Sequence, residues 1–238
     1  MKRIIGIVPT PSMGKPEDSC FSDSYKVGNN YILRTAEAGC VPVGLAPVNY
    51  WLDEKALEAC DGFLVQGGSE FYPYHFQVMH HALATGKKYL GICLGSQLIY
   101  VYFKLRSVVE EEGYEGDLVK AMCAYLAKQE PGFTFQKRIP DHRGGKVERG
   151  NEDAAKHDVD VIPGTLLHRV LGRDRMRLCS YHYLCTPPDQ TLVKINSWSA
   201  KGDGVVEGVE YGENILGVQG HPEADNLLPE LFAFLSED

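Results

Sequence analysis

The most informative stretch of the chain is residues 89–99, Tyr89-Leu90-Gly91-Ile92-Cys93-Leu94-Gly95-Ser96-Gln97-Leu98-Ile99. An apolar run that predicts a strand passes directly into a G-x-C-x-G pattern and then into residues with helical spacing. Glycines two positions before and two after a nucleophile permit the sharp strand-to-helix turn that exposes such a residue. The positive end of the helix favours the thiolate of Cys93. The pattern predicts a nucleophilic cysteine, and its alternative is a buried cysteine between packing glycines.

The first hundred residues alternate between short apolar runs and helical patterns. The strands are expected at residues 3–8, 41–45, 62–65 and 88–92, and the helices at 27–39, 53–59 and 76–85. Alternation of this kind, with nearly continuous apolar strands, indicates a parallel sheet covered by helices on both faces.

The second half of the chain has a different pattern. Residues 107–156 are charged and irregular, with one expected helix at 117–128 and solvated loops at 141–145 and 148–156. Beyond them, strands are expected at 159–162, 176–180, 192–197, 205–210 and 215–219, with a turn at 202–204 and a last helix at 227–235. We therefore expect one domain over residues 1–238, an α/β flavodoxin-like three-layer sandwich whose mostly parallel central sheet has a C-terminal antiparallel β-rich portion.

Composition limits the classes of function. The chain has 24 Lys and Arg against 32 Asp and Glu, a formal net charge of −8, which argues against nucleic acid or an anionic membrane as the main partner. No stretch approaches the roughly 18–20 apolar residues of a membrane span. The seven cysteines are odd in number, lack C-x-x-C pairing and follow no secretion signal, so we expect reduced thiols in a cytoplasmic protein.

Neither a metal nor a cofactor is expected. His75, His80 and His81 fall on a predicted surface helix, where no carboxylate or cysteine has ligand spacing. The chain also lacks a G-x-x-x-x-G-K-[ST] phosphate loop.

Two further stretches complement Cys93. In Gly217-Val218-Gln219-Gly220-His221-Pro222-Glu223, a predicted strand ends at a histidine, which can act as base and then acid, and at a carboxylate, which can orient it. In Val65-Gln66-Gly67-Gly68, two glycines follow a strand, so backbone amides are placed where an oxyanion could be received. A plain glycine turn is the alternative for the second stretch.

Taken in chain order, these three stretches resemble the class I glutamine amidotransferase superfamily, and within it the γ-glutamyl-γ-aminobutyrate hydrolase branch, as a divergent member. The resemblance spans essentially the whole chain. It includes His157-Asp158-Val159, Ser180-Tyr181-His182 and Asp203-Gly204-Val205-Val206-Glu207.

The resemblance implies a cofactor-free amidohydrolase with a Cys93, His221 and Glu223 triad, acting on the side-chain amide of a small γ-glutamyl compound through a thioester. It also implies roles for residues around the triad: the backbone amides of Gly68 and Leu94 as oxyanion donors, and Gln97, Ser180, Tyr181, His182 and Glu207 as residues of the substrate pocket.

Departures from the branch leave other functions open. Leu94 stands where the hydrolases usually have arginine, as in biosynthetic glutaminases, and residues 106–116 replace a usual family stretch. The chain can therefore also be a glutaminase subunit that delivers ammonia to a partner synthase, or a non-catalytic protein that binds a glutamyl metabolite. An α/β-hydrolase with Asp203 or Glu207 as its acid is a further alternative. The oligomeric state is open, with a homodimer as one option.

Overall fold

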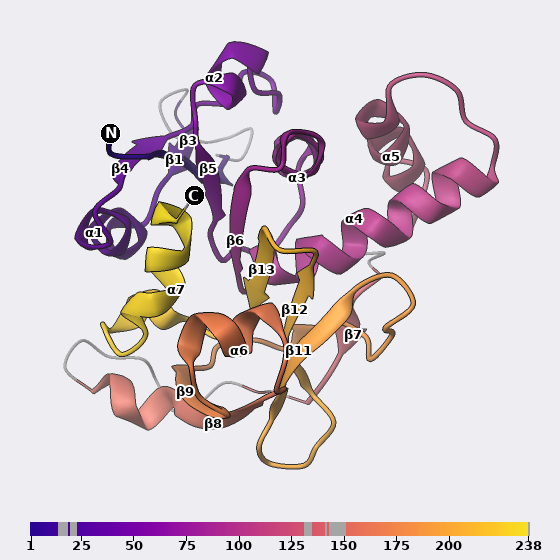
Figure 1. Ribbon diagram of the computed structural model, residues 1–238. Helices are drawn as coiled ribbons and strands as arrows, with labels where there is room; N and C mark the ends of the chain where they lie inside the picture. The colour runs from indigo at the N-terminus through magenta and orange to yellow at the C-terminus, as the bar shows by residue number, and fades with distance from the viewer. Residues whose placement is uncertain (14–18, 20–22, 131–134, 141, 143–150, 238) are drawn as a thin grey trace.

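A nine-stranded sheet forms the centre of the computed structural model, which describes residues 1–13, 19, 23–130, 135–140, 142 and 151–237 (Figure 1). Its strand order is β4-β1-β5-β6-β13-β12-β11-β8-β9. The first five strands in this order are parallel, and every pairing from β13 to β9 is antiparallel. The expected fold class is confirmed, including the antiparallel C-terminal portion.

The strands are β1 (Ile4–Val8), β2 (Thr10–Ser12), β3 (Ser24–Lys26), β4 (Val41–Gly44), β5 (Gly62–Val65), β6 (Lys88–Ile92), β7 (Lys137–Arg138), β8 (Lys156–Val161), β9 (Arg175–Cys179), β10 (Leu184–Cys185), β11 (Lys194–Ser199), β12 (Val206–Tyr211) and β13 (Ile215–Val218). The helices are α1 (Asn29–Glu37), α2 (Glu54–Glu58), α3 (Pro73–Thr85), α4 (Leu94–Glu111), α5 (Leu118–Leu126), α6 (Leu166–Leu171) and α7 (Pro229–Ala233). Short 3₁₀ turns lie at Glu152–Ala155, Pro222–Ala224 and Phe234–Ser236.

Helices cover both faces of the sheet because successive side chains of a strand point to opposite faces. In β5, Phe63 and Val65 pack in one core cluster with side chains of α3, α4 and α5, whereas Leu64 packs in a second cluster with side chains of α1, α6 and α7. In Figure 1, α3, α4 and α5 accordingly lie on one side of the parallel strands, and α1 and α7 on the other.

The turn from β6 into α4 depends on two close backbone approaches. A Cβ on Gly91 would lie 2.3 Å from the carbonyl oxygen of Gly95, and a Cβ on Gly95 would lie 2.3 Å from that of Val65. The Tyr89 hydroxyl donates to the Gly95 carbonyl at 2.7 Å and closes the turn. A side chain at either glycine of the G-x-C-x-G pattern would therefore overlap with backbone atoms, so both positions require glycine.

Three expectations about local structure are wrong. Residues 107–111 are helical, because α4 continues to Glu111 along the apolar face that it packs on the sheet. The loop expected at 148–156 contains, from residue 151 on, a 3₁₀ turn and the start of β8. In the solvated loop expected at 141–145, His142 is buried. Residues 141 and 143–150 lie outside the described part. His75 is buried rather than on the surface: its Nδ1 accepts the Tyr72 N–H at 2.9 Å, and burial lowers its pKa to about 3.

Among the described residues, no helix combines the length and the hydrophobicity that crossing a lipid bilayer requires.

The close approach at the turn generates a stability prediction. The substitution Gly95→Ala inserts a methyl group against the Val65 carbonyl and should lower the free energy of unfolding by about 1–3 kcal/mol in urea titrations. Gly44→Ala is the matched control, because the new Cβ would have an ordinary contact of 3.4 Å with Val27. Equal unfolding free energies for the two variants would contradict the proposed close packing.

Candidate active site

Three turns meet at one edge of the sheet. Gly67 and Gly68 follow β5, Cys93 follows β6, and His221 follows β13, each one to three residues after the strand end. These strands are adjacent and parallel in the order β5-β6-β13, so their carboxyl ends lie side by side. This edge is where open α/β sheets bind ligands. The topology therefore brings together segments that are more than 120 residues apart, as the hydrogen bond between Gln219 and Cys93 also shows.

Cys93 has a constrained backbone and a nearly buried side chain. Its φ of 54° is unusual for a residue with a side chain, and the thiol residue is 7% exposed. Its N–H donates to the Val218 carbonyl at 2.9 Å, which ties the turn to β13. The side-chain amide of Gln219 donates to Sγ at 3.6 Å. The sequence analysis missed Gln219, although the residue lies inside the stretch that ends in His221.

His221 and Glu223 form a close pair beside this sulfur. The Nδ1 atom of His221 lies 2.7 Å from Oε1 of Glu223. Burial opposes the charged form of the imidazole, but the negative charge of Glu223, followed by that of Cys93, outweighs burial and raises the pKa of His221 well above its usual value. The His221 N–H donates to the Cys179 carbonyl at 2.8 Å, which fixes the histidine backbone.

Tyr31 of α1 links the Gly67 turn to this pair, and the sequence analysis missed this role. The Gly67 N–H donates to Tyr31 Oη at 3.1 Å. Burial, followed by the charge of Glu223 and a hydrogen bond to it, raises the pKa of Tyr31 well above its usual value. A Cβ on Gly67 would lie 2.9 Å from His221 Cε1 and 3.4 Å from Cys93 Cβ, so only glycine fits between the two side chains.

A small cavity of about 50 Å³ opens beside the cysteine. It is lined by Gly68, Ser69, Cys93, Leu94, Gln97, Gln136, Tyr181, His182, Tyr183 and Leu184. Five of the residues expected around the nucleophile are thus gathered at this cavity. The Gln97 amide is held by protein groups, because Nε2 donates to the Leu184 carbonyl at 2.8 Å and to Gln219 Oε1 at 2.9 Å, and Oε1 accepts from Gln136.

Two expected pocket residues lie elsewhere. Ser180 is buried and its hydroxyl donates to the His142 carbonyl. Glu207, which is fully buried on β12, faces a group of histidines. Neither residue lines the cavity at Cys93, so their contact with substrate stays a prediction.

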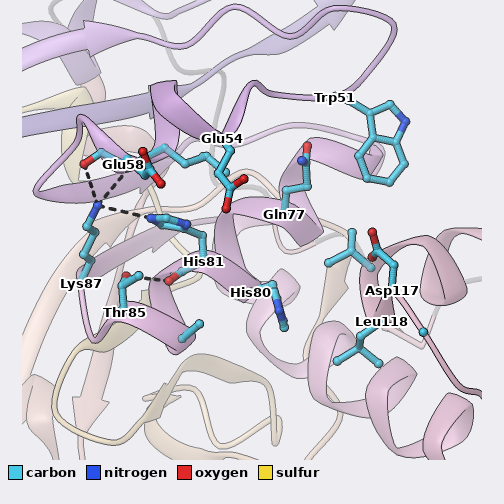
Figure 2. Close-up of a pocket in the computed structure, with 14 residues that line it drawn as sticks. Trp51, Glu54, Glu58, Gln77, His80, His81, Thr85, Lys87, Asp117 and Leu118 are labelled. Carbon is cyan, nitrogen blue, oxygen red and sulfur yellow. Dashed lines mark hydrogen bonds between the residues drawn. The ribbon is translucent and has the colours of Figure 1, made fainter.

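A larger cavity, of about 760 Å³, is separate from this chemistry. It lies between α2, α3 and the start of α5, where Figure 2 shows Trp51, Glu54 and Asp117 around it. Lys87 on its wall precedes β6, whereas Cys93 follows β6, so the two cavities are at opposite ends of this strand. The reactive groups, and not cavity size, identify the candidate active site.

The pairing of His221 with Glu223 decides against the α/β-hydrolase alternative. In that alternative, the acid precedes the histidine, with Asp203 or Glu207 in the role. Here the residue on Nδ1 is Glu223, and the sheet has the order and direction described above.

Comparison with models of protein families identifies a family that this chain matches. The model of the peptidase C26 family matches residues 74–223, more than half of the chain and the whole segment from α3 to Glu223.

Relatives of this chain include CTP synthases. The CTP synthase of Thermus thermophilus is 26% identical over 196 residues, which cover 73% of this chain and 34% of that protein. The chain therefore spans about a third of the length of this relative. A glutamine amidotransferase-like protein of Rickettsia prowazekii is 24% identical over 276 residues, covering 93% of this chain and 91% of its own length.

A solved structure supports the fold. The glutaminase domain of the Trypanosoma brucei CTP synthase, with bound acivicin, superposes with a TM-score of 0.65 at 16% identity, covering 98% of this chain and 92% of that one.

The charge arrangement around His221 generates a pH prediction. The substitution Glu223→Gln removes the negative charge at 2.7 Å from Nδ1, so the pKa of His221 should fall and the imidazolium should lose its proton at a lower pH. NMR titration of the histidine side chains measures this change, with the half-buried His168, which pairs with Asp174, as the internal control. An unchanged His221 titration would show that Glu223 does not stabilise the imidazolium.

Proposed function

The chain belongs to the peptidase C26 family, and we propose that it is a cysteine-dependent amidohydrolase that cleaves the side-chain amide of a γ-glutamyl compound, a γ-glutamyl amine or amino acid. The observation that carries this proposal is the meeting of Cys93, His221 and Glu223 at the carboxyl edge of adjacent parallel strands. The similarity to CTP synthase glutaminase domains supports the same class of bond, because a glutaminase acts on the side-chain amide of glutamine.

The first half of the reaction forms a thioester. The Cys93 thiolate attacks the amide carbonyl carbon, and the resulting oxyanion then expels the amine. His221, which is protonated because its pKa is raised, donates its proton to the leaving nitrogen. Glu223 holds the ring by Nδ1 and stabilises its positive charge.

The second half of the reaction hydrolyses the thioester and releases glutamate. The now neutral His221 removes a proton from water, the hydroxide attacks the thioester carbonyl, and the Cys93 thiolate leaves as glutamate forms. The imidazolium and thiolate are then restored. Nucleophile, base and donors all come from the chain, so the proposed reaction needs no cofactor.

The oxyanion donors in this proposal are the amides of Gly68 and Leu94. Leu94 is the first residue of α4, whose initial N–H groups have no partner within the helix. In the Gly67-Gly68 turn the first amide is engaged by Tyr31, so the second is the one assigned to the oxyanion. Removing one such donor typically costs about 10²–10³ in rate.

On the substrate side, we assign the glutamyl group to the wall formed by Gln97, Tyr181 and His182. The cavity of about 50 Å³ is narrow, so substrate binding requires the exposed Tyr181 and Tyr183 to move outward. Ser180 and Glu207 support this wall from behind.

A reducing compartment suits this chemistry. All six cysteines in the described part of the chain are free thiols. We therefore place the enzyme in the cytoplasm, where a nucleophilic thiol stays reduced.

A panel of γ-glutamyl amines, γ-glutamyl amino acids and glutamine tests the proposal. We expect glutamate release by the wild-type protein and a decrease of at least about 10³-fold in Cys93→Ser. Cys123→Ser in α5 is the matched control and should keep full activity, since this thiol is remote from the cavity residues. A folded protein that releases no glutamate from any compound, or an active Cys93→Ser variant, would refute the proposal; the first result would favour a non-catalytic binding protein.

A second candidate function is a glutaminase that delivers ammonia to a partner synthase. The observations in its favour are Leu94 directly after the nucleophile and a match that covers 34% of a CTP synthase. In this alternative the leaving group is ammonia, so a bulky amine should be excluded from the site.

The ratio of kcat/KM values separates the two functions. We expect kcat/KM for γ-glutamyl amines to be at least about tenfold higher than kcat/KM for glutamine, because an apolar amine leaving group gains contacts that ammonia lacks. The reverse order, with glutamine turnover that is near zero alone and rises on addition of a synthase, would establish the second function instead.

A further inference from the structure

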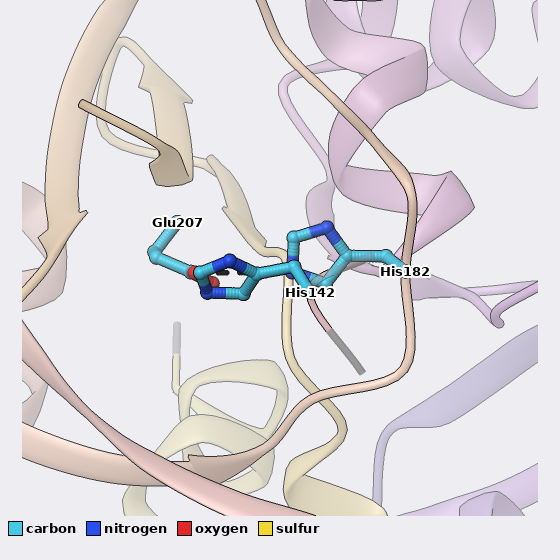
Figure 3. A group of neighbouring side chains, drawn as sticks. All are labelled: His142, His182 and Glu207. Carbon is cyan, nitrogen blue, oxygen red and sulfur yellow. Dashed lines mark ion pairs between the residues drawn. The ribbon is translucent and has the colours of Figure 1, made fainter. Parts of the chain in front are cut away.

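A buried group of His142, His182 and Glu207 lies behind the wall of the active-site cavity (Figure 3). Their exposed fractions are 6%, 3% and 0%. The three residues come from different segments: His182 lies between β9 and β10, Glu207 is on β12, and His142 precedes the 3₁₀ turn at Glu152–Ala155. We call them the histidine–glutamate cluster.

The side chains of this cluster converge on one carboxylate oxygen. Glu207 Oε1 lies 3.1 Å from His142 Nε2 and 3.7 Å from His182 Nε2. Two ligand atoms of a tetrahedral zinc ion, each 2.0–2.1 Å from the metal, are separated by about 3.4 Å. The observed separations lie on either side of this value. His157 Nε2, at 3.3 Å from the same oxygen, is the nearest further donor.

The other ring nitrogens of the two histidines face acceptors. His182 Nδ1 lies 3.0 Å from the Leu184 carbonyl oxygen, which can only accept, so Nδ1 carries the proton and a neutral ring presents the Nε2 lone pair to Glu207. His142 Nδ1 lies 3.6 Å from Asp203 Oδ2. Metal-ligating histidines commonly have this arrangement, with the second nitrogen donating to a carbonyl or a carboxylate.

Three of the four facing atoms lack a hydrogen bond to any described residue, whereas His142 Nε2 lies 3.0 Å from His157 Nδ1. Within the described part of the chain, neither oxygen of Glu207 nor Nε2 of His182 has a partner with hydrogen-bonding geometry, and all three atoms are buried. A buried carboxylate without such partners is costly, and a lone pair directed at it adds repulsion. A cation between these atoms removes both costs.

We infer that the histidine–glutamate cluster is a binding site for a divalent transition-metal ion, of which zinc is the best match. Two imidazoles and one carboxylate suit zinc, whereas magnesium and calcium prefer a set of oxygen ligands. His182 and Leu184 also line the cavity at Cys93, so an ion at this site stiffens the cavity wall. The ion is structural here and takes no part in the proposed hydrolysis.

Zinc titration of the full chain tests this inference. Cysteine and histidine also bind zinc, so every protein carries Cys93→Ser to exclude binding at the nucleophile. After treatment with a chelator, competition with a chromophoric chelator should give one equivalent of Zn²⁺ with a Kd of about 1 μM or tighter. The zinc X-ray absorption spectrum should show only nitrogen and oxygen ligands, at about 2.0–2.2 Å.

Variants locate the ion. His142→Ala and the isosteric Glu207→Gln should each weaken zinc binding by at least about 100-fold. The matched control His168→Ala should bind as the parent does, because His168 is at the surface beside Asp174. Circular dichroism verifies that each variant is folded. If His142→Ala is unfolded, the zinc affinity of Glu207→Gln and the absorption spectrum decide whether the ion binds at the cluster. Absence of tight binding, sulfur among the ligands, or equal affinity in Glu207→Gln would overturn the inference.

Discussion

The position of the nucleophile depends on two places where backbone packs on backbone. Gly91 meets the Gly95 carbonyl, and Gly95 meets that of Val65, at distances that exclude any side chain. These contacts bring the first turn of α4 directly onto the strands and hold Cys93 at a positive φ. The direction of the thiol and the positive end of the helix near it then follow from the sheet rather than from contacts of the cysteine side chain.

Charged and hydrogen-bonding side chains surround Cys93 on two sides. Glu223 lies 2.7 Å from Nδ1 of His221, and its charge is the largest of the effects that raise the pKa of this imidazole against burial. On the other side of the sulfur, Gln219 connects to Gln97, whose amide also donates to the Leu184 carbonyl, the acceptor of the His182 ring. A continuous path of polar contacts therefore joins the nucleophile to the histidine–glutamate cluster.

Sequence patterns predicted the fold and singled out the residues of the candidate site because both have local signatures. Strands such as β5 and β6 agree with their expected bounds, and Cys93 and His221 were identified from glycine spacing and strand ends. Tyr31 and Gln219 were missed because their roles arise only when the sheet brings α1 and β13 against Cys93. The histidine–glutamate cluster has no local signature for the same reason: its members are distant in sequence, whereas a sequence pattern draws attention only to histidines close together, such as His75.

A backbone hydrogen bond between His221 and Cys179 joins the segment after β13 to the end of β9. Cys179 ends β9, the outermost strand of the antiparallel half, yet its carbonyl accepts the N–H of the residue that follows β13, in the middle of the sheet. The sheet therefore curls until its last strand returns to the reactive edge. Opening of β9 breaks the backbone hydrogen bond that fixes His221, so the stability of the antiparallel half bears on the position of the imidazole.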